Sequence, residues 1–444
     1  MKFIDMFSGI GGFRSALELS GHECIAYSEI DKYAKQSYQA IYDTENEIDL
    51  GDITEISQEY LSRFKEENDI VVGGSPCQSF SLAGGRKGFE DTRGTLFFEY
   101  AKVVKETQPK YFLFENVKGM MSHDKGNTIR VVLETFNELG YYIDFNVFNS
   151  KYYDIPQNRE RIYIVGKRKD LVEQPKYHDK TKGKKKFDEV HNWAVDNINY
   201  VELLPQLQTE VTTRLVDVLE DEVDEKFYLS DEKVKKLTLN HDLNKNMKSN
   251  ITIEQVGNIV DNKETFGGNP QRGRVYNPKG ISPALNCMRG GGLEPKVAVI
   301  GNTSNTGHRS HNVHDIEGIS PTIAARDYKG AKQIAIREAT KQGYAIAEQG
   351  DSVNVSYPTS KTRRGRVGKQ VAQTLQAGEV NQGVVMEDIR IRKLTPLECW
   401  RLQGFTDEQF YKAQNDGVSN SQLYKQAGNS VTVNVVDAIV KELK

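Results

Sequence analysis

Short apolar runs alternate with helix-like stretches through the first 170 residues of the chain. The runs are residues 2–7, 24–29, 69–72, 111–117 and 162–166, and each has the length of a buried strand. Residues 13–19, after the first run, have the spacing of an amphipathic helix. This alternation predicts an α/β sheet, and such sheets bind ligands at the carboxyl ends of their strands. The residues that directly follow each run are therefore the first candidates for chemistry.

A cysteine follows the third run. Cys77 lies in the sequence GGSPCQSFS, which spans residues 73–81. An isolated cysteine is more often a small buried hydrophobe than a reactive group. Here the glycines and the proline predict a turn at the end of a strand, and the Ser- and Gly-rich stretch that follows predicts a loop. We therefore interpret Cys77 as a nucleophile.

Two more strand ends supply an acid and a cation. Glu115 lies near the end of the run 111–117, and Arg161 in the sequence QNRER leads into the run 162–166. Taken singly, Glu115 could be a helix cap and Arg161 a member of a surface ion pair. A thiolate that attacks an electron-poor ring needs an acid to protonate a ring nitrogen and a cation to hold a carbonyl oxygen. Together with Cys77, these two residues match that requirement.

The first run continues into a glycine-rich turn with the sequence FSGIGG, at residues 7–12. A glycine turn before a helix lets a ligand approach the backbone, although the spacing is not the dinucleotide pattern G-x-G-x-x-G. Glu29 and Asp52 stand near the ends of the next predicted strands, where they suit a ribose diol and an exocyclic amine. The turn lacks the lysine of a phosphate-binding P-loop. These features favour a nucleoside ligand without a triphosphate.

In sequence and in order, these segments resemble the motifs of DNA (cytosine-5) methyltransferases of the bacterial and phage restriction-modification type. The resemblance covers about residues 1–170 and 388–444. It implies a Rossmann-like, S-adenosylmethionine-dependent methyltransferase domain and a smaller, mostly β and loop target-recognition domain. The matching segments are residues 7–12, 76–78, 115–117, 157–161, 392–399, 402–405 and 428–431.

The resemblance also implies a reaction. Cys77 would attack C6 of a cytosine that is flipped out of double-stranded DNA, and Glu115 would engage N3 and the exocyclic amine. C5 would then accept the methyl group of S-adenosyl-L-methionine, which leaves as S-adenosyl-L-homocysteine. Arg161 would hold O2 with support from Arg159, whereas the base that removes the C5 proton is not assigned. The expected cofactor-binding residues are Phe7, Gly9, Ile10, Gly11, Gly12, Glu29, Ile30, Asp52, Ile53, Pro76, Asn429, Ser430 and Val431.

Composition fits an enzyme of the cell interior. The 444 residues are 37% hydrophobic, enough for at least one α/β core, and two or three domains are expected. The four cysteines are widely spaced and suggest neither a disulfide framework nor a zinc site, so no metal is expected. No apolar run reaches 18 residues, and the first strand leaves no room for a signal peptide. We expect a cytoplasmic protein that does not bind membranes.

The charge is unevenly distributed. The net charge is −3, but residues 257–386 hold 17 Lys and Arg against 10 Asp and Glu, so this region is +7 and the rest of the chain is −10. The cations peak at residues 361–366, which could be a solvated loop but favour phosphate contact. In the family, a Thr followed by an aliphatic residue marks a target-recognition element. The residues expected to contact DNA are Gln78, Ser81, Arg93, Thr322, Arg363, Arg364, Arg366 and Thr374.

Four regions are predicted: a catalytic domain at 1–185, a linker and start of the small domain at 186–256, a target-recognition domain at 257–386 and a return segment at 387–444. The third region holds 18 of the 37 glycines, which predicts short strands and loops. It also repeats itself, because residues 280–285 recur at 318–323. Two interpretations explain the repeats. The preferred one is a single recognition domain with duplicated units, and the other is several recognition elements that serve one catalytic site.

Other functions fit part of the sequence. A cytosine-5 methyltransferase that acts on tRNA or another RNA would have the same catalytic motifs, but it would not need the large repeated region. A DNA-binding regulator without activity would not need every catalytic position filled, and a thiol-dependent dehydrogenase leaves Glu115 and residues 157–161 unexplained. We expect a monomer that serves restriction-modification or phage self-protection, with any cognate restriction endonuclease encoded separately. The methylated sequence cannot be derived, because base readout depends on side-chain placement in the grooves.

Overall fold

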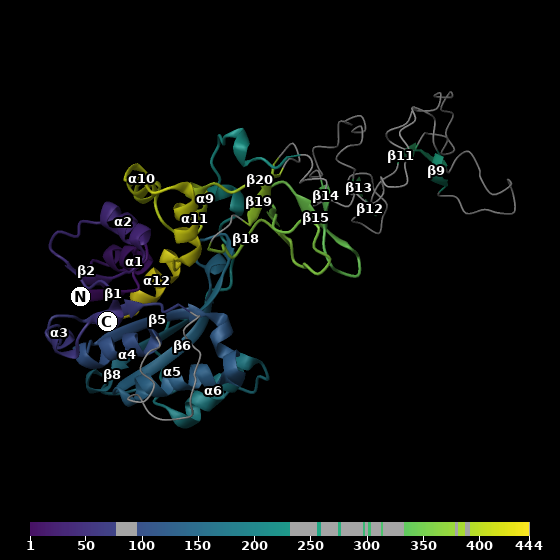
Figure 1. Cartoon of the computed structure of the whole chain (residues 1–444). Helices are drawn as coiled ribbons and strands as arrows, with labels where there is room; N and C mark the ends of the chain where they lie inside the picture. The colour runs from purple at the N-terminus through teal and green to yellow at the C-terminus, as the bar shows by residue number, and fades with distance from the viewer. Residues whose placement is uncertain are drawn as a thin grey trace. The chain divides into compact units, whose positions relative to one another are not determined.

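The computed structural model describes residues 1–76, 96–230, 333–377, 381–386 and 391–443, together with five short strands between residues 255 and 313 (Figure 1). The chain forms two compact units. The first comprises Met1–Asp221, Val371–Val380 and Thr395–Lys444, and the second comprises Glu222–Gln370 and Asn381–Leu394.

A seven-stranded mixed sheet organises the first unit, in the order β3-β2-β1-β4-β5-β8-β6. β8 runs antiparallel to both of its neighbours, whereas the other pairs in the sheet are parallel. All the apolar runs of the sequence analysis lie in this sheet, which confirms the predicted α/β class. The strands are β1 (Lys2–Met6), β2 (Glu23–Ser28), β3 (Ile48–Asp49), β4 (Ile70–Gly73), β5 (Tyr111–Val117), β6 (Tyr141–Asn149) and β8 (Glu160–Arg168).

Helices cover both faces of this sheet, because successive residues of a strand point to opposite faces. Ile4 and Met6 of β1 pack into a core with α3, α4 and α5, whereas the intervening Asp5 lies against Tyr38 of α2 on the other face. The helices of this part of the chain are α1 (Gly12–Leu19), α2 (Lys32–Ile41), α3 (Gln58–Ser62), α4 (Leu96–Thr107), α5 (Asn127–Glu138) and α6 (Lys186–Asn197).

Aromatic rings fill the core beneath the centre of the sheet. Phe112 of β5 stacks on Phe136 of α5 with ring centroids 4.1 Å apart, and Phe97 of α4 meets Phe136 edge to face. Gly166 of β8 faces Phe112, and a Cβ atom at this glycine would lie 1.9 Å from the Phe112 ring. The ring therefore occupies the space that a side chain at position 166 would need.

The C-terminal segment returns to the first unit as four helices. Thr395 caps the first of them, its hydroxyl accepting from the Glu398 backbone, and Pro396 is the first helical residue, which is the usual sequence pattern of a helix start. The last helix packs on α1, and the two termini lie near each other in Figure 1. The four helices are α9 (Pro396–Arg401), α10 (Asp407–Asn415), α11 (Asn420–Asn429) and α12 (Val433–Val440).

The first unit extends beyond the predicted catalytic boundary at residue 185. α6 packs against α5, and residues 198–204 run along the edge strand β6, where Ile143 exchanges backbone hydrogen bonds with Asn199 and Val201. Asp144 accepts the backbone N–H groups of Leu203 and Leu204 at 2.8 Å each. Residues 186–221 thus belong to this compact unit rather than to a separate linker.

The described part of the second unit is built from short strands. β14 (Gln333–Arg337) and β15 (Tyr344–Glu348) form an antiparallel hairpin, and a four-stranded sheet has the order β17-β16-β19-β20. Ile334, Ile336, Val353, Val385 and Ile391 fill its small core. This smaller β region agrees with the prediction. Its other strands are β16 (Ser352–Asn354), β17 (Val367–Gly368), β19 (Gln382–Val385), β20 (Ile391–Lys393), β9 (Gln255–Asn258), β10 (Arg274–Tyr276), β11 (Lys296–Val297), β12 (Gly301–Asn302) and β13 (Asn312–Val313).

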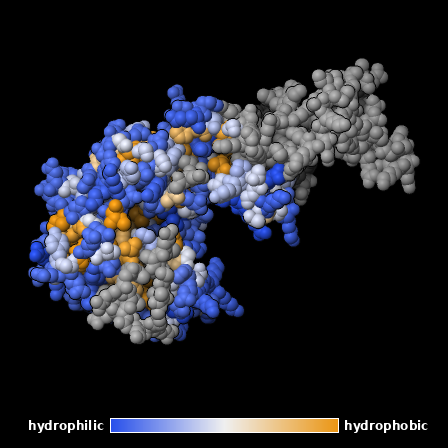
Figure 2. Space-filling model, viewed as in Figure 1, coloured by the Kyte–Doolittle hydropathy of each residue, from blue (hydrophilic) through white to orange (hydrophobic). Residues whose placement is uncertain are grey.

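The surface character differs between the two units. On the face shown in Figure 2, hydrophobic residues reach the surface mainly in the first unit, whereas the described part of the second unit is largely hydrophilic. Within the part of the chain that the structure describes, no helix has the length and hydrophobicity needed to cross a membrane.

The contact between Gly166 and Phe112 predicts a specific loss of stability. Gly166→Ala should lower the free energy of unfolding by about 1–3 kcal/mol, because the new methyl group has no space beside the Phe112 ring. Gly119→Ala is the matched control, since its Cβ would meet nothing closer than 3.8 Å, and it should stay within about 0.5 kcal/mol of the wild type. Urea unfolding measures both variants, and equal midpoints would contradict the packing described for β8.

Candidate active site

The backbone that leads to the predicted nucleophile lies beside Glu115. Gly74 follows β4, and a Cβ atom at this position would lie 2.8 Å from Glu115 Oε2. The side-chain amide of Asn116 donates to the Ser75 carbonyl at 2.9 Å. β4 and β5 are therefore joined where Pro76 enters the nucleophile segment. Cys77 itself lies outside the described residues, as do the predicted DNA contacts Gln78, Ser81 and Arg93.

Glu115 and Arg161 form an ion pair, with 3.1 Å between Oε1 and Nε. The antiparallel pairing of β5 with β8 places Glu115 opposite Tyr163 and Arg161 opposite Val117, so the two side chains are diagonal neighbours. Glu115 is only 9% exposed. Burial raises the pKa of its carboxyl group, and the charges of Arg161 and Arg159 oppose that rise. The sequence prediction that these residues converge agrees with this geometry.

Arg159 is a buried cation that binds the C-terminal segment. Its guanidinium donates to the carbonyl oxygens of Gly428 at 3.2 Å and Ser430 at 2.6 Å. Burial, together with the nearby charge of Arg161, lowers the pKa of Arg159 to about 9, while Glu115 has the opposite effect. Arg159 thus fixes residues 428–430 beside the strand that carries Arg161.

Gln157, in the short strand just before β8, contacts two more segments. Its side chain donates to the Leu402 carbonyl at 2.8 Å and accepts from the Leu375 backbone at 3.4 Å. β18 (Ala372–Gln373) pairs in parallel with β7 (Gln157–Asn158), and the Thr374 hydroxyl donates to the Asn158 carbonyl at 2.9 Å. The structure therefore places Thr374, a predicted DNA contact, in the first unit with its hydroxyl on the backbone of residues 157–161.

The glycine turn after β1 is closed by a carboxylate. Phe7, Gly9 and Gly11 have positive φ angles of 54°, 57° and 82°, a backbone conformation that suits glycine and is uncommon for phenylalanine. Glu29, just after β2, accepts from the backbone of Gly9 at 2.8 Å and of Asp31 at 2.7 Å. The predicted turn and the predicted acid are therefore brought together.

The remaining predicted cofactor residues differ in exposure. Asp52 lies after β3 and accepts hydrogen bonds from the backbone N–H and the hydroxyl of Thr54. These two bonds lower the pKa of Asp52, and the backbone bond has the larger effect. Ile30 is 71% exposed beside Glu29, whereas Ile10 and Ile53 are almost completely buried. The Ile53 side chain packs in the core beneath the sheet, which leaves the backbone of this residue for the predicted cofactor contact.

The C-terminal segment lies against the glycine turn. A Cβ atom at Gly12 would lie 2.7 Å from Val431 Cγ2 and 2.8 Å from Ser430 Oγ, so this contact requires glycine. Gly428, Ser430 and Val431 are buried, whereas Asn429 is exposed. The same segment thus contacts both Gly12 of the turn and Arg159, which directly precedes β8.

Two residues beneath the turn were not predicted. The Tyr42 hydroxyl donates to the Gly11 carbonyl at 2.8 Å, and Arg14 lies over the Tyr42 ring at 4.3 Å from its centroid. The Arg14 guanidinium is held by Glu18 at 2.7 Å and Glu47 at 2.6 Å. No local motif marks these residues, because Tyr42 and Glu47 reach the turn only after α2 folds back on α1.

The predicted basic cluster divides between the surface and the interior of the second unit. Arg364 is exposed and Arg363 is half-buried. Arg366 is completely buried and donates to the carbonyl oxygens of Asn354, Ser356 and Tyr357 at 2.7–2.9 Å. A guanidinium that is buried among three carbonyls does not face a phosphate, so a direct DNA contact is the wrong prediction for Arg366 in this structure. Thr322 lies outside the described residues.

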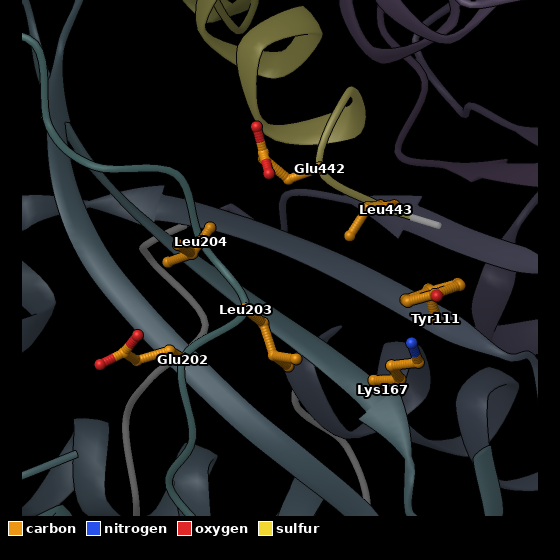
Figure 3. Close-up of a pocket in the computed structure, with 7 residues that line it drawn as sticks. All are labelled: Tyr111, Lys167, Glu202, Leu203, Leu204, Glu442 and Leu443. Atoms are coloured by element: carbon orange, nitrogen blue, oxygen red, sulfur yellow. The ribbon is translucent and has the colours of Figure 1, made fainter. Parts of the chain in front are cut away.

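A separate pocket of about 330 Å³ opens where β5 begins and β8 ends (Figure 3). Tyr111 is the first residue of β5, and it pairs with Lys167 near the end of the antiparallel β8. Glu115 and Arg161 lie toward the opposite ends of these two strands. The pocket is therefore distinct from the candidate site; Tyr111, Lys167, Glu202, Leu203, Leu204, Glu442 and Leu443 line it.

Comparison with solved structures supports the fold. A crystal structure of a Spodoptera frugiperda DNMT2 mutant matches with a TM-score of 0.50 and 16% identity, covering 100% of this chain and 99% of that one. At this identity the match concerns the fold alone.

Relatives of similar length match this chain in sequence from end to end. The orphan methyltransferase M.SPRI of Bacillus phage SPR is 42% identical over 454 residues, covering 100% of this chain and 97% of the relative. The type II methyltransferase M.HhaI of Haemophilus parahaemolyticus is 35% identical over 440 residues, covering 99% and 93%. The family model of the C-5 cytosine-specific DNA methylases matches residues 1–444. With the glycine turn, the Glu115–Arg161 pair and the returning C-terminal segment in one unit, the chain belongs to the C-5 cytosine-specific DNA methylase family.

Proposed function

We propose that this DNA (cytosine-5-)-methyltransferase uses Cys77 as its nucleophile and Glu115 and Arg161 to hold and polarise the target ring. The observation that carries the proposal is the ion pair of Glu115 with Arg161 beside the backbone that enters the Cys77 segment. An acid and a cation at one strand edge, next to a thiol, are what addition to a cytosine ring requires.

The proposed reaction has three steps. The Cys77 thiolate forms a bond to C6, and the electron pair of the C5–C6 double bond moves to C5. C5 takes a methyl group from the sulfonium of S-adenosyl-L-methionine, which supplies the electrophilic methyl and leaves as S-adenosyl-L-homocysteine. Loss of the C5 proton to a base returns an electron pair, and the bond between C6 and sulfur breaks to release the thiolate.

Glu115 is the proposed acid at N3. Burial raises the pKa of its carboxyl group, which favours a protonated group able to donate to a ring nitrogen. Arg161 would donate to O2, where negative charge develops as the thiolate adds. Arg159 does not reach the ring in this proposal; it acts by fixing residues 428–430 through their carbonyl groups.

The residues around the glycine turn suit S-adenosyl-L-methionine, the methyl donor of this family. Glu29 already bonds the turn backbone through Oε2, and its carboxylate would accept from a ribose diol. The exposed Ile30 side chain would pack against the flat adenine, and Asp52 would accept from the exocyclic amine. Phe7, Gly9, Gly11, Gly12, Pro76, Asn429, Ser430 and Val431 complete the proposed site.

Double-stranded DNA is the proposed macromolecular substrate, read as a short specific sequence. A thiol cannot reach C6 inside a duplex, so the target nucleotide would be flipped out at a cost of a few kcal/mol. Arg363 and Arg364 would contact phosphate, and the backbone around Thr374 would support the strand that carries Arg161. Gln78, Ser81, Arg93 and Thr322 remain proposed DNA contacts. Methylation of RNA stays an alternative that the same assay can test with RNA substrates.

The proposed setting is a monomeric cytoplasmic enzyme that protects DNA. Relatives named as orphan methyltransferases come from Bacillus phages, and others are named as type II methyltransferases. An orphan enzyme would act without a restriction endonuclease, whereas a type II enzyme would be accompanied by one. We favour neither over the other.

The nucleophile assignment predicts the effect of one atom. Cys77→Ser should reduce methyl transfer to DNA at least about a thousandfold, because a hydroxyl at neutral pH is a far weaker nucleophile than a thiolate. DNA binding measured by gel shift should remain. Cys287→Ser, outside the catalytic motifs, is the control and should keep its activity. A Cys77→Ser enzyme with normal turnover would overturn the mechanism.

The acid assignment predicts a change in the pH–rate profile. The pKa of Glu115 is raised, so its carboxyl group should be protonated below that pKa and should lose the proton as pH rises through it. The value of kcat/KM should decline over the same pH range. Thiolate formation at Cys77 should give the opposite limb, so the profile should be bell-shaped. Glu115→Gln should lower kcat about 10²–10⁴-fold and lose the alkaline decline. The rates are measured as transfer of a radiolabelled methyl group to DNA. An alkaline decline that is unchanged in Glu115→Gln would refute this role.

A further inference from the structure

One loop of the second unit presents an aromatic ring on a strained backbone. Tyr357 is 76% exposed, the largest value among the exposed hydrophobic residues of the described chain. Its φ angle is +46°, and it precedes Pro358. A left-handed conformation is uncommon for tyrosine, and a following proline favours extended backbone instead. The surrounding structure must therefore impose this conformation.

Arg366 imposes it from inside the unit. The guanidinium donates through Nη1 to Asn354 and Ser356, each at 2.9 Å, and through Nη2 to Tyr357 at 2.7 Å, in every case to the backbone carbonyl. Glu338, itself buried, accepts from the Arg366 backbone. A buried cation is costly unless it is hydrogen-bonded. Here the two terminal nitrogens of the cation are hydrogen-bonded to the backbone of residues 354–357, which fixes that backbone.

The other arm of the loop is also held. The Ala339 backbone donates to the Arg363 carbonyl at 2.7 Å, and Arg364 Nε donates to the Ala339 carbonyl at 2.9 Å. The Ser360 backbone donates to the Tyr357 carbonyl at 3.0 Å. The tyrosine ring thus projects from a backbone that is fixed on both sides.

The charges of the same loop indicate what meets the ring. Lys361 and Arg364 are exposed within seven residues of Tyr357, and Arg363 is half-buried between them. Cations beside an exposed aromatic ring match duplex DNA, whose phosphates take the charges and whose grooves present apolar base edges such as the thymine methyl group. A rigid ring also loses little conformational entropy on binding.

We propose that Tyr357 determines sequence specificity: its ring lies against the base pairs of duplex DNA while Lys361, Arg363 and Arg364 contact the flanking phosphates. This inference rests on the proposed action on double-stranded DNA and adds to it a residue that reads sequence. The strained backbone at Tyr357 keeps the ring on the outside of the unit, whereas a relaxed loop would allow the ring to fold back onto the surface.

Three substitutions at position 357 separate the ring from the backbone. Tyr357→Ala removes the ring and keeps the strain, Tyr357→Phe keeps the ring, and Tyr357→Gly removes both. Tyr411→Ala, a half-exposed tyrosine of α10, is the matched control. Purified proteins are incubated with S-adenosyl-L-methionine and an unmethylated plasmid, and methylation rates are mapped at base resolution. The readout is the ratio between the rate at the preferred sequence and that at sequences that differ by one base pair.

Tyr357→Ala and Tyr357→Gly should lower this ratio by about fivefold or more, as expected when the discrimination at one base pair is lost. Tyr357→Phe and Tyr411→Ala should retain it. The melting temperature of Tyr357→Gly should equal or exceed that of the wild type, because glycine relieves the strain. Arg364→Ala should instead slow methylation at all sequences alike and flatten the salt dependence.

Three results would overturn the inference. Wild-type ratios in Tyr357→Ala and Tyr357→Gly would show that the ring reads nothing. A Tyr357→Phe enzyme as unselective as Tyr357→Ala would assign the role to the hydroxyl instead of the ring. A wild-type enzyme that methylates no DNA would refute the proposed function as well, whereas unchanged ratios in the variants of a selective wild-type enzyme would refute this inference alone.

Discussion

The guanidinium of Arg159 donates to two carbonyl groups that lie 269 and 271 residues further along the chain. This buried interaction joins the strand that carries Arg161 to the segment that packs on Gly12 of the glycine turn. The proposed base-holding residues and the proposed cofactor residues are therefore linked by one backbone segment, residues 428–431. The sheet already orders β1 and β8, and this segment adds a second connection between the turn that follows β1 and the start of β8.

Glycine has a defined role at two points of this arrangement. Gly12 admits Val431 and Ser430, and Gly74 admits the carboxylate of Glu115. In both places a methyl group would occupy the position of a functional neighbour. The site is thus assembled by close backbone approach, which is why its residues come from strand ends and turns rather than from helix faces.

Much of this could be predicted from the sequence, because strands and turns leave local signals. The apolar runs gave the positions of β1, β2, β4, β5 and β8, and the alternation of elements gave the α/β class. The convergence of Glu115 with Arg161 followed from the rule that ligands bind at strand ends. Thr395 was identifiable as a cap because capping depends on residues only three apart.

The errors concern burial, which depends on partners that are distant in the sequence. Arg366 belongs to a basic cluster and reads as a phosphate contact, but its partners are carbonyls of residues 354–357. The burial of Ile53 was equally hidden: its side chain fills the core below the sheet, although the position stays a proposed cofactor contact through its backbone. Tyr42 supports the turn only because α2 folds against α1. Composition alone does not distinguish these cases, since each depends on tertiary packing.

The measurement that tests the account most directly is base-resolution mapping of 5-methylcytosine on a plasmid that expresses this chain in a host without cytosine methylation of its own. The account predicts methyl groups at C5 of cytosines within a defined short sequence. It predicts none on the same plasmid without the coding sequence. Cytosines that remain unmethylated while the intact protein accumulates would contradict it.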